Sequence, residues 1–182
     1  MSINPAPWKS HGLRIFDSVL AAVNAARVAW RLYQARRIVA KGHHMTTYGE
    51  REITAHHEAG HAVIARALDV YVACVTIIPF AGRSGSTWHK PPKRPEGAIL
   101  IAMAGPLAEA RLTGTLIYGG DDEERIASAI RHLSGPREHY EAQASTLVAE
   151  HWREIEIVAD ELLDGAGKLY GPMLDEAIRC VD

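Results

Sequence analysis

Three of the ten histidines in this chain of 182 residues lie within six positions of one another, at residues 56, 57 and 61. Small and apolar residues at helical spacing over residues 52–68 predict a helix for this segment. His57 and His61 are four residues apart, so their imidazoles lie on one face of that helix, one turn apart. Gly60 in the helix interior costs about 1 kcal/mol relative to alanine. A close approach by another element, or by a ligand site, would explain that cost.

The segment from His57 to His61 reads His-Glu-x-x-His, a spacing at which two imidazoles can bind one Zn²⁺ at about 2.0–2.1 Å. Glu58 follows the first histidine, so its side chain points beside the metal rather than at it. A carboxylate there can accept a proton from a water molecule whose pKa the metal lowers to about 7. An amide that the metal polarises is then hydrolysed without a protein nucleophile. The alternative is a helix that carries surface histidines and no metal.

A catalytic zinc site needs a third protein ligand and one open position. The acidic run at residues 121–124 (DDEE), at the start of a predicted helix, offers a carboxylate for this purpose. Acidic residues at a helix N-terminus also complement the helix dipole, which is the alternative role for any one of them. His56 points about 100° away from His57 around the helix, so we expect it beside the ligands or in solvent.

The rest of the pattern is mostly helical with one small sheet, which predicts the α+β class. The β-branched run at residues 70–78 predicts a strand, and residues 84–89 are expected to form a short partner strand. The partner strand offers an edge to an extended peptide, whereas the first strand is expected to be core. Pro106 within a helical stretch predicts a kink or a break. The segments expected to be helical are residues 13–39, 52–68, 96–112, 123–133, 138–163 and 173–180.

Charge and cysteine content narrow the classes of function. Lys and Arg total 20 against 22 Asp and Glu, which argues against a broad nucleic-acid-binding surface, so we expect no nucleic-acid partner. The two cysteines, Cys74 and Cys180, are far apart and have no metal-type spacing, which fits a reducing compartment. We therefore expect a cytoplasmic protein.

Residues 1–45 are expected to form a tail and an amphipathic helix, ahead of a main domain at residues 46–182. Polar groups interrupt every long apolar run of this helix, so it does not predict a transmembrane segment. Its basic residues Arg36, Arg37 and Lys41 can lie on an anionic membrane surface, which would be a peripheral contact. Docking of the helix on its own protein or on a partner is the favoured alternative.

The segment 54–63 (TAHHEAGHAV) is followed by VTIIP at residues 75–79 and by AGPLAEA at residues 104–110. Together with the acidic turn before Arg125 and the helical run that closes the chain, these segments resemble the zinc-peptidase domain of the membrane-anchored AAA proteases of the FtsH type. The resemblance covers residues 52–178. It implies a mainly helical, zincin-like metallopeptidase domain that binds zinc through two histidines and an aspartate.

Carried over by position, the resemblance makes His57 and His61 ligands of Zn²⁺ and Glu58 the catalytic base. Glu109 falls on an acidic helix position of the family. We treat it as a partner of one ligand histidine, with an ordinary surface glutamate as the alternative.

The third ligand is chosen among three neighbouring residues. Counting from Gly119 places the family's aspartate at Glu123, whereas residue type favours Asp122 or Asp121. We predict Asp122, because this choice keeps an aspartate at the helix start and puts Ile126 and its apolar neighbours on one inward face. Asp121 is the reserve.

Two departures from the family shape the predicted function. We expect no ATPase module, since the glycine-rich residues 165–168 lack the spacing and the preceding strand of a phosphate loop, and we expect no transmembrane segment. We predict a stand-alone zinc metalloendopeptidase that cuts polypeptides and that could form a homo-oligomer or use a separate ATPase or unfoldase partner. The alternative is a non-catalytic zinc-binding regulatory or interaction module that keeps the peptidase fold.

Overall fold

The computed structural model describes residues 48–179, which belong to one compact unit that begins at Tyr48. The tail and amphipathic helix predicted for residues 1–45 lie outside the described residues, and so does Cys180. The predicted domain boundary therefore stays a prediction. No helix within residues 48–179 has the length and apolar character needed to cross a membrane.

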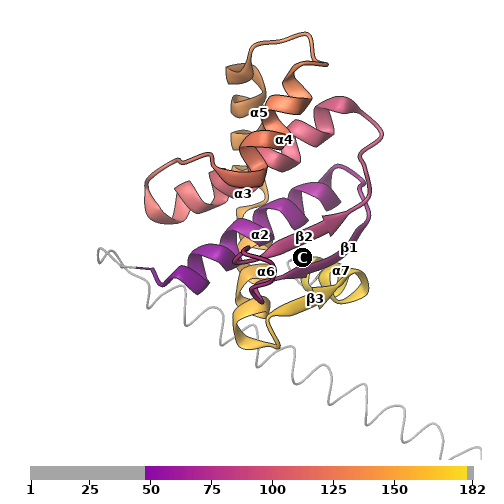
Figure 1. Cartoon of the computed structure of the whole chain (residues 1–182). Coiled ribbons are helices and arrows are strands. Elements are labelled where there is room, and N and C mark those ends of the chain that lie inside the picture. The colour runs from indigo at the N-terminus through magenta and orange to yellow at the C-terminus, as the bar shows by residue number, and fades with distance from the viewer. Residues whose placement is uncertain (1–47, 180–182) are drawn as a thin grey trace, which may run out of the picture. The chain divides into compact units, whose positions relative to one another are not determined.

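The described residues form a mainly helical fold with one small antiparallel sheet, which confirms the predicted α+β class (Figure 1). The histidine-bearing helix α2 contacts α3, α6 and the sheet, so it runs through the centre of the domain. The elements in chain order are α2 (Glu50–Ala67), β1 (Val72–Thr76), β2 (Ser86–His89), α3 (Pro95–Thr113), α4 (Gly120–Ile130), α5 (Arg137–Glu150), α6 (Trp152–Asp164), β3 (Lys168–Tyr170) and α7 (Gly171–Arg179).

The sheet has the strand order β2-β1-β3, and both pairings are antiparallel. Val75 in the central strand lies opposite Thr87 of β2 and Leu169 of β3. Val75 and Leu169 are buried in the core that the helices form with this face of the sheet. The predicted partner strand is confirmed as β2 at an edge of the sheet, and β1 is interior as expected. The sequence pattern does not predict β3, because three residues are too few to show a strand period.

Gly60 explains how closely two helices pack. A Cβ atom built on Gly60 would lie 2.7 Å from the carbonyl oxygen of Ala104 and 2.8 Å from the Cβ of Ala108, both on α3. Real side chains do not tolerate such distances, so only glycine lets α2 and α3 approach to this separation. This contact confirms the predicted close approach at Gly60 and brings α3 against the histidine-bearing part of α2.

Three features of the helices differ most from the sequence prediction. α3 continues through Pro106, so the predicted break is wrong; the missing hydrogen bond of one proline is outweighed by burial of the surrounding turns against α2. The predicted run over residues 138–163 divides into α5 and α6 at His151, whose ψ of 20° departs from helical geometry. α4 begins at Gly120, three residues earlier than predicted, after an extended Gly119. This earlier start puts Asp122 in the first turn.

Candidate metal centre

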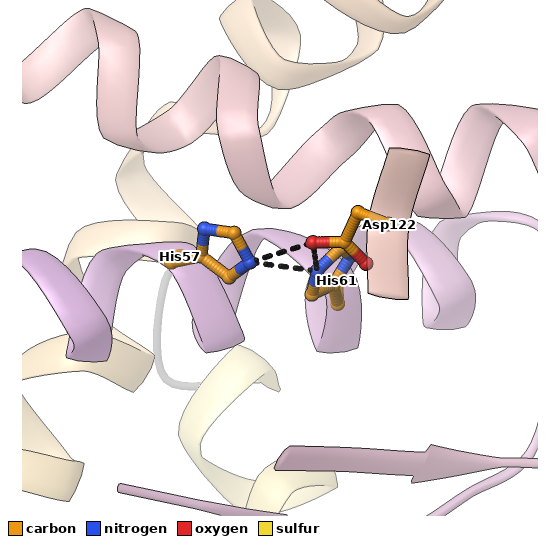
Figure 2. Close-up of side chains that lie close together, drawn as sticks. All are labelled: His57, His61 and Asp122. Atoms are coloured by element: carbon orange, nitrogen blue, oxygen red, sulfur yellow. Dashed lines mark hydrogen bonds and ion pairs between the residues drawn. The ribbon is translucent and has the colours of Figure 1, made fainter. Parts of the chain in front are cut away.

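Three potential metal-binding side chains meet where the first turn of α4 comes against the middle of α2 (Figure 2). Asp122 Oδ2 lies 2.9 Å from His57 Nε2 and 3.3 Å from His61 Nε2. The two Nε2 atoms are 3.1 Å apart. His61 and Asp122 are buried and His57 is partly buried. Residues 48–179 contain no other such convergence of three histidine, cysteine or acidic side chains.

The size of this triangle fits a zinc ion. Four donors at 2.0–2.1 Å in tetrahedral geometry lie about 3.3 Å from one another. The three separations between His57, His61 and Asp122, from 2.9 to 3.3 Å, are of this size. Two imidazole nitrogens with one carboxylate oxygen are also donors that zinc prefers. The donor set leaves a fourth position for a substrate or water.

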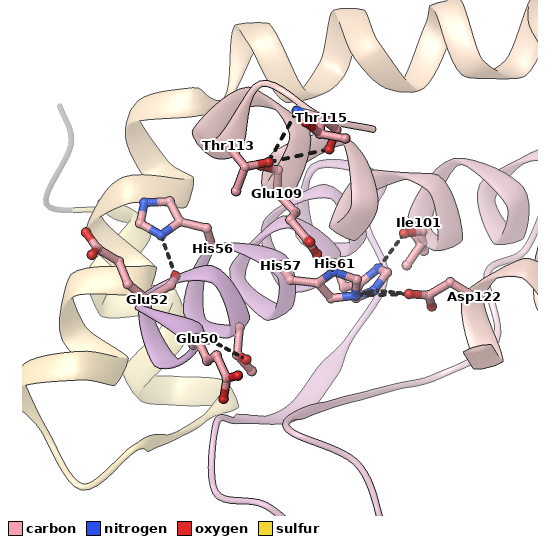
Figure 3. A network of polar contacts seen from close by, with 11 residues as sticks. Glu50, Glu52, His56, His57, His61, Ile101, Glu109, Thr113, Thr115 and Asp122 are labelled. Atoms are coloured by element: carbon pink, nitrogen blue, oxygen red, sulfur yellow. Dashed lines mark hydrogen bonds and ion pairs between the residues drawn. The ribbon is translucent and has the colours of Figure 1, made fainter. Parts of the chain in front are cut away.

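Each imidazole is oriented by its second nitrogen. His61 Nδ1 lies 2.7 Å from the carbonyl oxygen of Ile101, so this nitrogen is the donor. His57 Nδ1 lies 3.1 Å from Glu109 Oε2, a contact in which the nitrogen again donates (Figure 3). Because Nδ1 is the donor in each ring, Nε2 is the nitrogen that offers a lone pair to a metal once its own proton is lost. Glu109 thus lies where a partner of a ligand histidine is expected.

The helix α3 leaves room for the two rings only because Gly105 has no side chain. A Cβ on Gly105 would lie 2.3 Å from His61 Nε2 and 2.8 Å from His57 Nε2. Any other residue at this position would occupy the space between the donor atoms. Sequence reasoning missed this role, since Gly105 is distant in sequence from both histidines.

Charge interactions between Asp122 and the histidines shift the pKa values of the site. Burial lowers the pKa of His57, but hydrogen bonds to Asp122 and Glu109 outweigh burial and raise this pKa from 6.5 to about 9. Burial raises the pKa of Asp122, but hydrogen bonds from His57 and His61 outweigh it and hold this pKa well below the usual range. Without a metal, His57 is therefore a cation beside an anionic Asp122 at neutral pH.

The two alternative third ligands contact other groups. Asp121 forms an ion pair with Arg83 of the β1–β2 loop. Glu123 accepts two hydrogen bonds of 2.7 Å from the guanidinium of Arg137. Asp122 is the acidic residue of this turn that contacts the histidines.

His56 differs from its expected position beside the ligands or in solvent. Its side chain is buried, with Nδ1 2.9 Å from the carbonyl oxygen of Glu52 (Figure 3). The ring stacks on Trp152 with 5.8 Å between the ring centroids. The reason is that α6 packs on this side of α2, so the face that holds His56 is interior.

Glu58 is buried beside the histidines, and its contacts come from β2 and the loop before it. Glu58 Oε2 accepts a hydrogen bond of 2.7 Å from Thr87 Oγ1. Gly85 lies so close that a Cβ there would be 2.7 Å from Glu58 Cγ. Sequence reasoning missed both neighbours, and the one available signal was the predicted partner strand at residues 84–89.

A cavity of about 620 Å³ opens onto these groups. α2 contributes both histidines and Glu58, α4 contributes Asp122 and Arg125, and β2 contributes Thr87 and its neighbours. The donor triangle and the carboxylate of Glu58 therefore face one accessible space. Such an arrangement can hold a metal ion and a substrate together.

Two curated proteins are similar to part of this chain. The ATP-dependent zinc metalloprotease FtsH of Magnetococcus marinus is 40% identical over 95 residues, which is 46% of this chain and 14% of that protein. The ATP-dependent zinc metalloprotease FtsH of Pelobacter propionicus is 34% identical over 91 residues, or 44% of this chain and 15% of that protein. No family model matches the chain. The chain thus contains an FtsH-related region and spans about one seventh of the length of these relatives.

Proposed function

We propose that this protein is a zinc-dependent metalloendopeptidase. The observation that carries the proposal is the convergence of His57, His61 and Asp122 on one point, with Glu58 beside them in the same cavity. The names of the FtsH relatives support it, because both are zinc metalloproteases. The His-Glu-x-x-His motif alone would be a weaker argument, since it specifies two ligands and leaves the third open.

In this proposal His57 Nε2, His61 Nε2 and an oxygen of Asp122 hold the zinc ion. When bound, zinc supplies Lewis-acid chemistry, which polarises the scissile carbonyl and acidifies a water molecule. Glu109 and the carbonyl of Ile101 keep the two imidazoles in the tautomer that binds metal. The anionic Asp122 balances part of the metal charge.

Glu58 acts as the general base. Its carboxylate accepts a proton from the attacking water as the water oxygen bonds to the carbonyl carbon. The same carboxyl returns that proton to the amide nitrogen as the carbon–nitrogen bond breaks, so the leaving amine departs neutral.

The substrate in this proposal is a polypeptide in extended form. β2 pairs only with β1 in the described sheet, so its other edge has free backbone donors and acceptors. Residues 86–88 of this strand line the cavity. An extended peptide that pairs with this edge would pass in front of the metal ligands.

The predicted partners and location of the protein are not tested by the described residues. They are a homo-oligomer, a separate ATPase or unfoldase partner, a cytoplasmic location and a peripheral membrane contact. The helix that would make the membrane contact lies in residues 13–39, outside the described residues.

The test combines metal analysis with cleavage of an unstructured protein such as casein. The zinc-loaded wild type should cleave casein, and Glu58→Gln should bind zinc equally but lose cleavage. Cleavage retained by Glu58→Gln would remove the proposed base. Stoichiometric zinc without any cleavage by the wild type would instead favour a non-catalytic zinc-binding regulatory or interaction module.

A further inference from the structure

The side chain of Thr87 connects the edge strand to the proposed base. Thr87 lies in β2 opposite Val75, with its backbone fixed by pairing to the central strand. Its hydroxyl is 2.7 Å from Glu58 Oε2 and 3.1 Å from the backbone carbonyl oxygen of Glu58. A hydroxyl has one proton to donate, and the shorter contact to a charged acceptor is the stronger one.

The two oxygens of Glu58 have different surroundings. Oε2 is held by Thr87, whereas Oε1 has no hydrogen-bond partner among residues 48–179. Gly85 lies against the other side of the carboxyl group, where a Cβ would be 2.8 Å from Oε1. The carboxylate is therefore fixed by one hydrogen bond and by close backbone packing.

We propose that Thr87 is the positioning residue for Glu58: its hydroxyl fixes Oε2 so that Oε1 is the oxygen that takes the proton. The inference rests on the proposed function, because it assigns a role within the same reaction. Thr87 contacts the base and no reacting atom. Its effect is to remove the freedom of a glutamate side chain that otherwise has several rotamers.

The location of Thr87 adds a second consequence. Thr87, which fixes the carboxylate of Glu58, belongs to β2, and the free edge of β2 is the edge that would pair with the substrate. Peptide position and base position then share one rigid element, so the proton acceptor keeps its alignment when a peptide binds. A residue on a loop would not give the same alignment.

The experiment compares Thr87→Val, which removes the hydroxyl and keeps the shape, with Thr87→Ser, which keeps the hydroxyl. In the zinc-loaded protein Thr87→Val should lower kcat about 10- to 100-fold, a part of the 10²–10⁴ that a general base contributes. KM should stay within about twofold and the zinc content should be unchanged. Thr87→Ser should keep most of the kcat of the wild type. Thr146→Val on the exposed face of α5 is the matched control and should behave as wild type.

A measurement that does not depend on activity is the side-chain conformation of Glu58 in the metal-free protein. NMR couplings should report one rotamer in the wild type and in Thr87→Ser, and averaged rotamers in Thr87→Val. Full kcat with one Glu58 rotamer in Thr87→Val would overturn the inference. If the wild type binds zinc but cleaves nothing, the proposed function fails, and the rotamer measurement still decides whether Thr87 holds Glu58.

Discussion

Gly105 of α3 faces the imidazole of His61 at a distance that no other residue allows. A Cβ on Gly105 would lie 2.3 Å from His61 Nε2, well inside van der Waals contact. Two helices therefore build the candidate metal centre together: α2 provides the imidazoles, and α3 provides a position without a side chain in front of them. The centre depends on this pairing as much as on the donor atoms.

Gly105→Ala should therefore impair metal binding. The added methyl group must displace the His61 ring, and the strain of such overpacking, about 1–3 kcal/mol, corresponds to about a 5- to 150-fold loss in zinc affinity. Titration with a zinc-sensitive competitor dye measures this loss. Gly49→Ala is the control, because a Cβ there meets nothing within 4 Å, and it should bind zinc as the wild type does. Equal zinc affinity in both variants would contradict the assigned geometry.

Asp122→Ala should remove the third donor. Zinc content after purification is expected to fall from about one ion per chain to a small fraction, since two histidines alone form an incomplete site. Asp121→Ala should keep the metal, because Asp121 pairs with Arg83 and not with the histidines. Atomic emission spectroscopy of the two purified variants makes the comparison. Loss of zinc from Asp121→Ala alone would show that the reserve ligand is the correct one.

The parts of the site that could be predicted from sequence are those set by local geometry. The spacing of His57 and His61 fixes their common face on any helix, and Glu58 follows from the same turn. The third ligand is harder to predict, because neighbouring residues of a helix differ by about 100° in direction and the choice depends on where α4 begins. The three-residue difference in that start is the kind of boundary error that a sequence pattern cannot resolve.

Contacts between elements could not be predicted in this way. Thr87 and Gly105 are 29 and 44 residues away from the side chains of Glu58 and His61 that they contact, and no periodicity links such positions. His56 shows the same limit, since its burial depends on α6 packing against one side of α2. In the fold, β3 could not be predicted from sequence, because its three residues show no strand pattern of their own. They form a strand because they pair with β1.

Glu109→Ala should weaken zinc binding without removing it. Glu109 Oε2 accepts a hydrogen bond from His57 Nδ1 and so sets the direction of the lone pair on Nε2. Loss of such a partner typically costs about 10- to 100-fold in metal affinity. Glu124→Ala, at an exposed position on α4, is the matched control and should leave the affinity unchanged. Identical zinc affinities of the two variants would show that Glu109 is an ordinary surface glutamate and not a partner of His57.

The metal-free protein should lose stability as the pH rises from 6.5 to 9. The pKa of His57 is raised from 6.5 in the unfolded chain to about 9 in the fold, so its stabilising charge is complete below pH 6.5 and is lost as the pH approaches 9. The upper bound of this loss is about 3 kcal/mol, from about 2.5 pKa units at 1.36 kcal/mol each. Asp122 stays charged throughout this range, because its pKa is lowered and its stabilisation is lost only in acid. Urea unfolding with a chelator present measures the slope, and His57→Gln should lack this component; an equal slope in that variant would assign the pH dependence to another group.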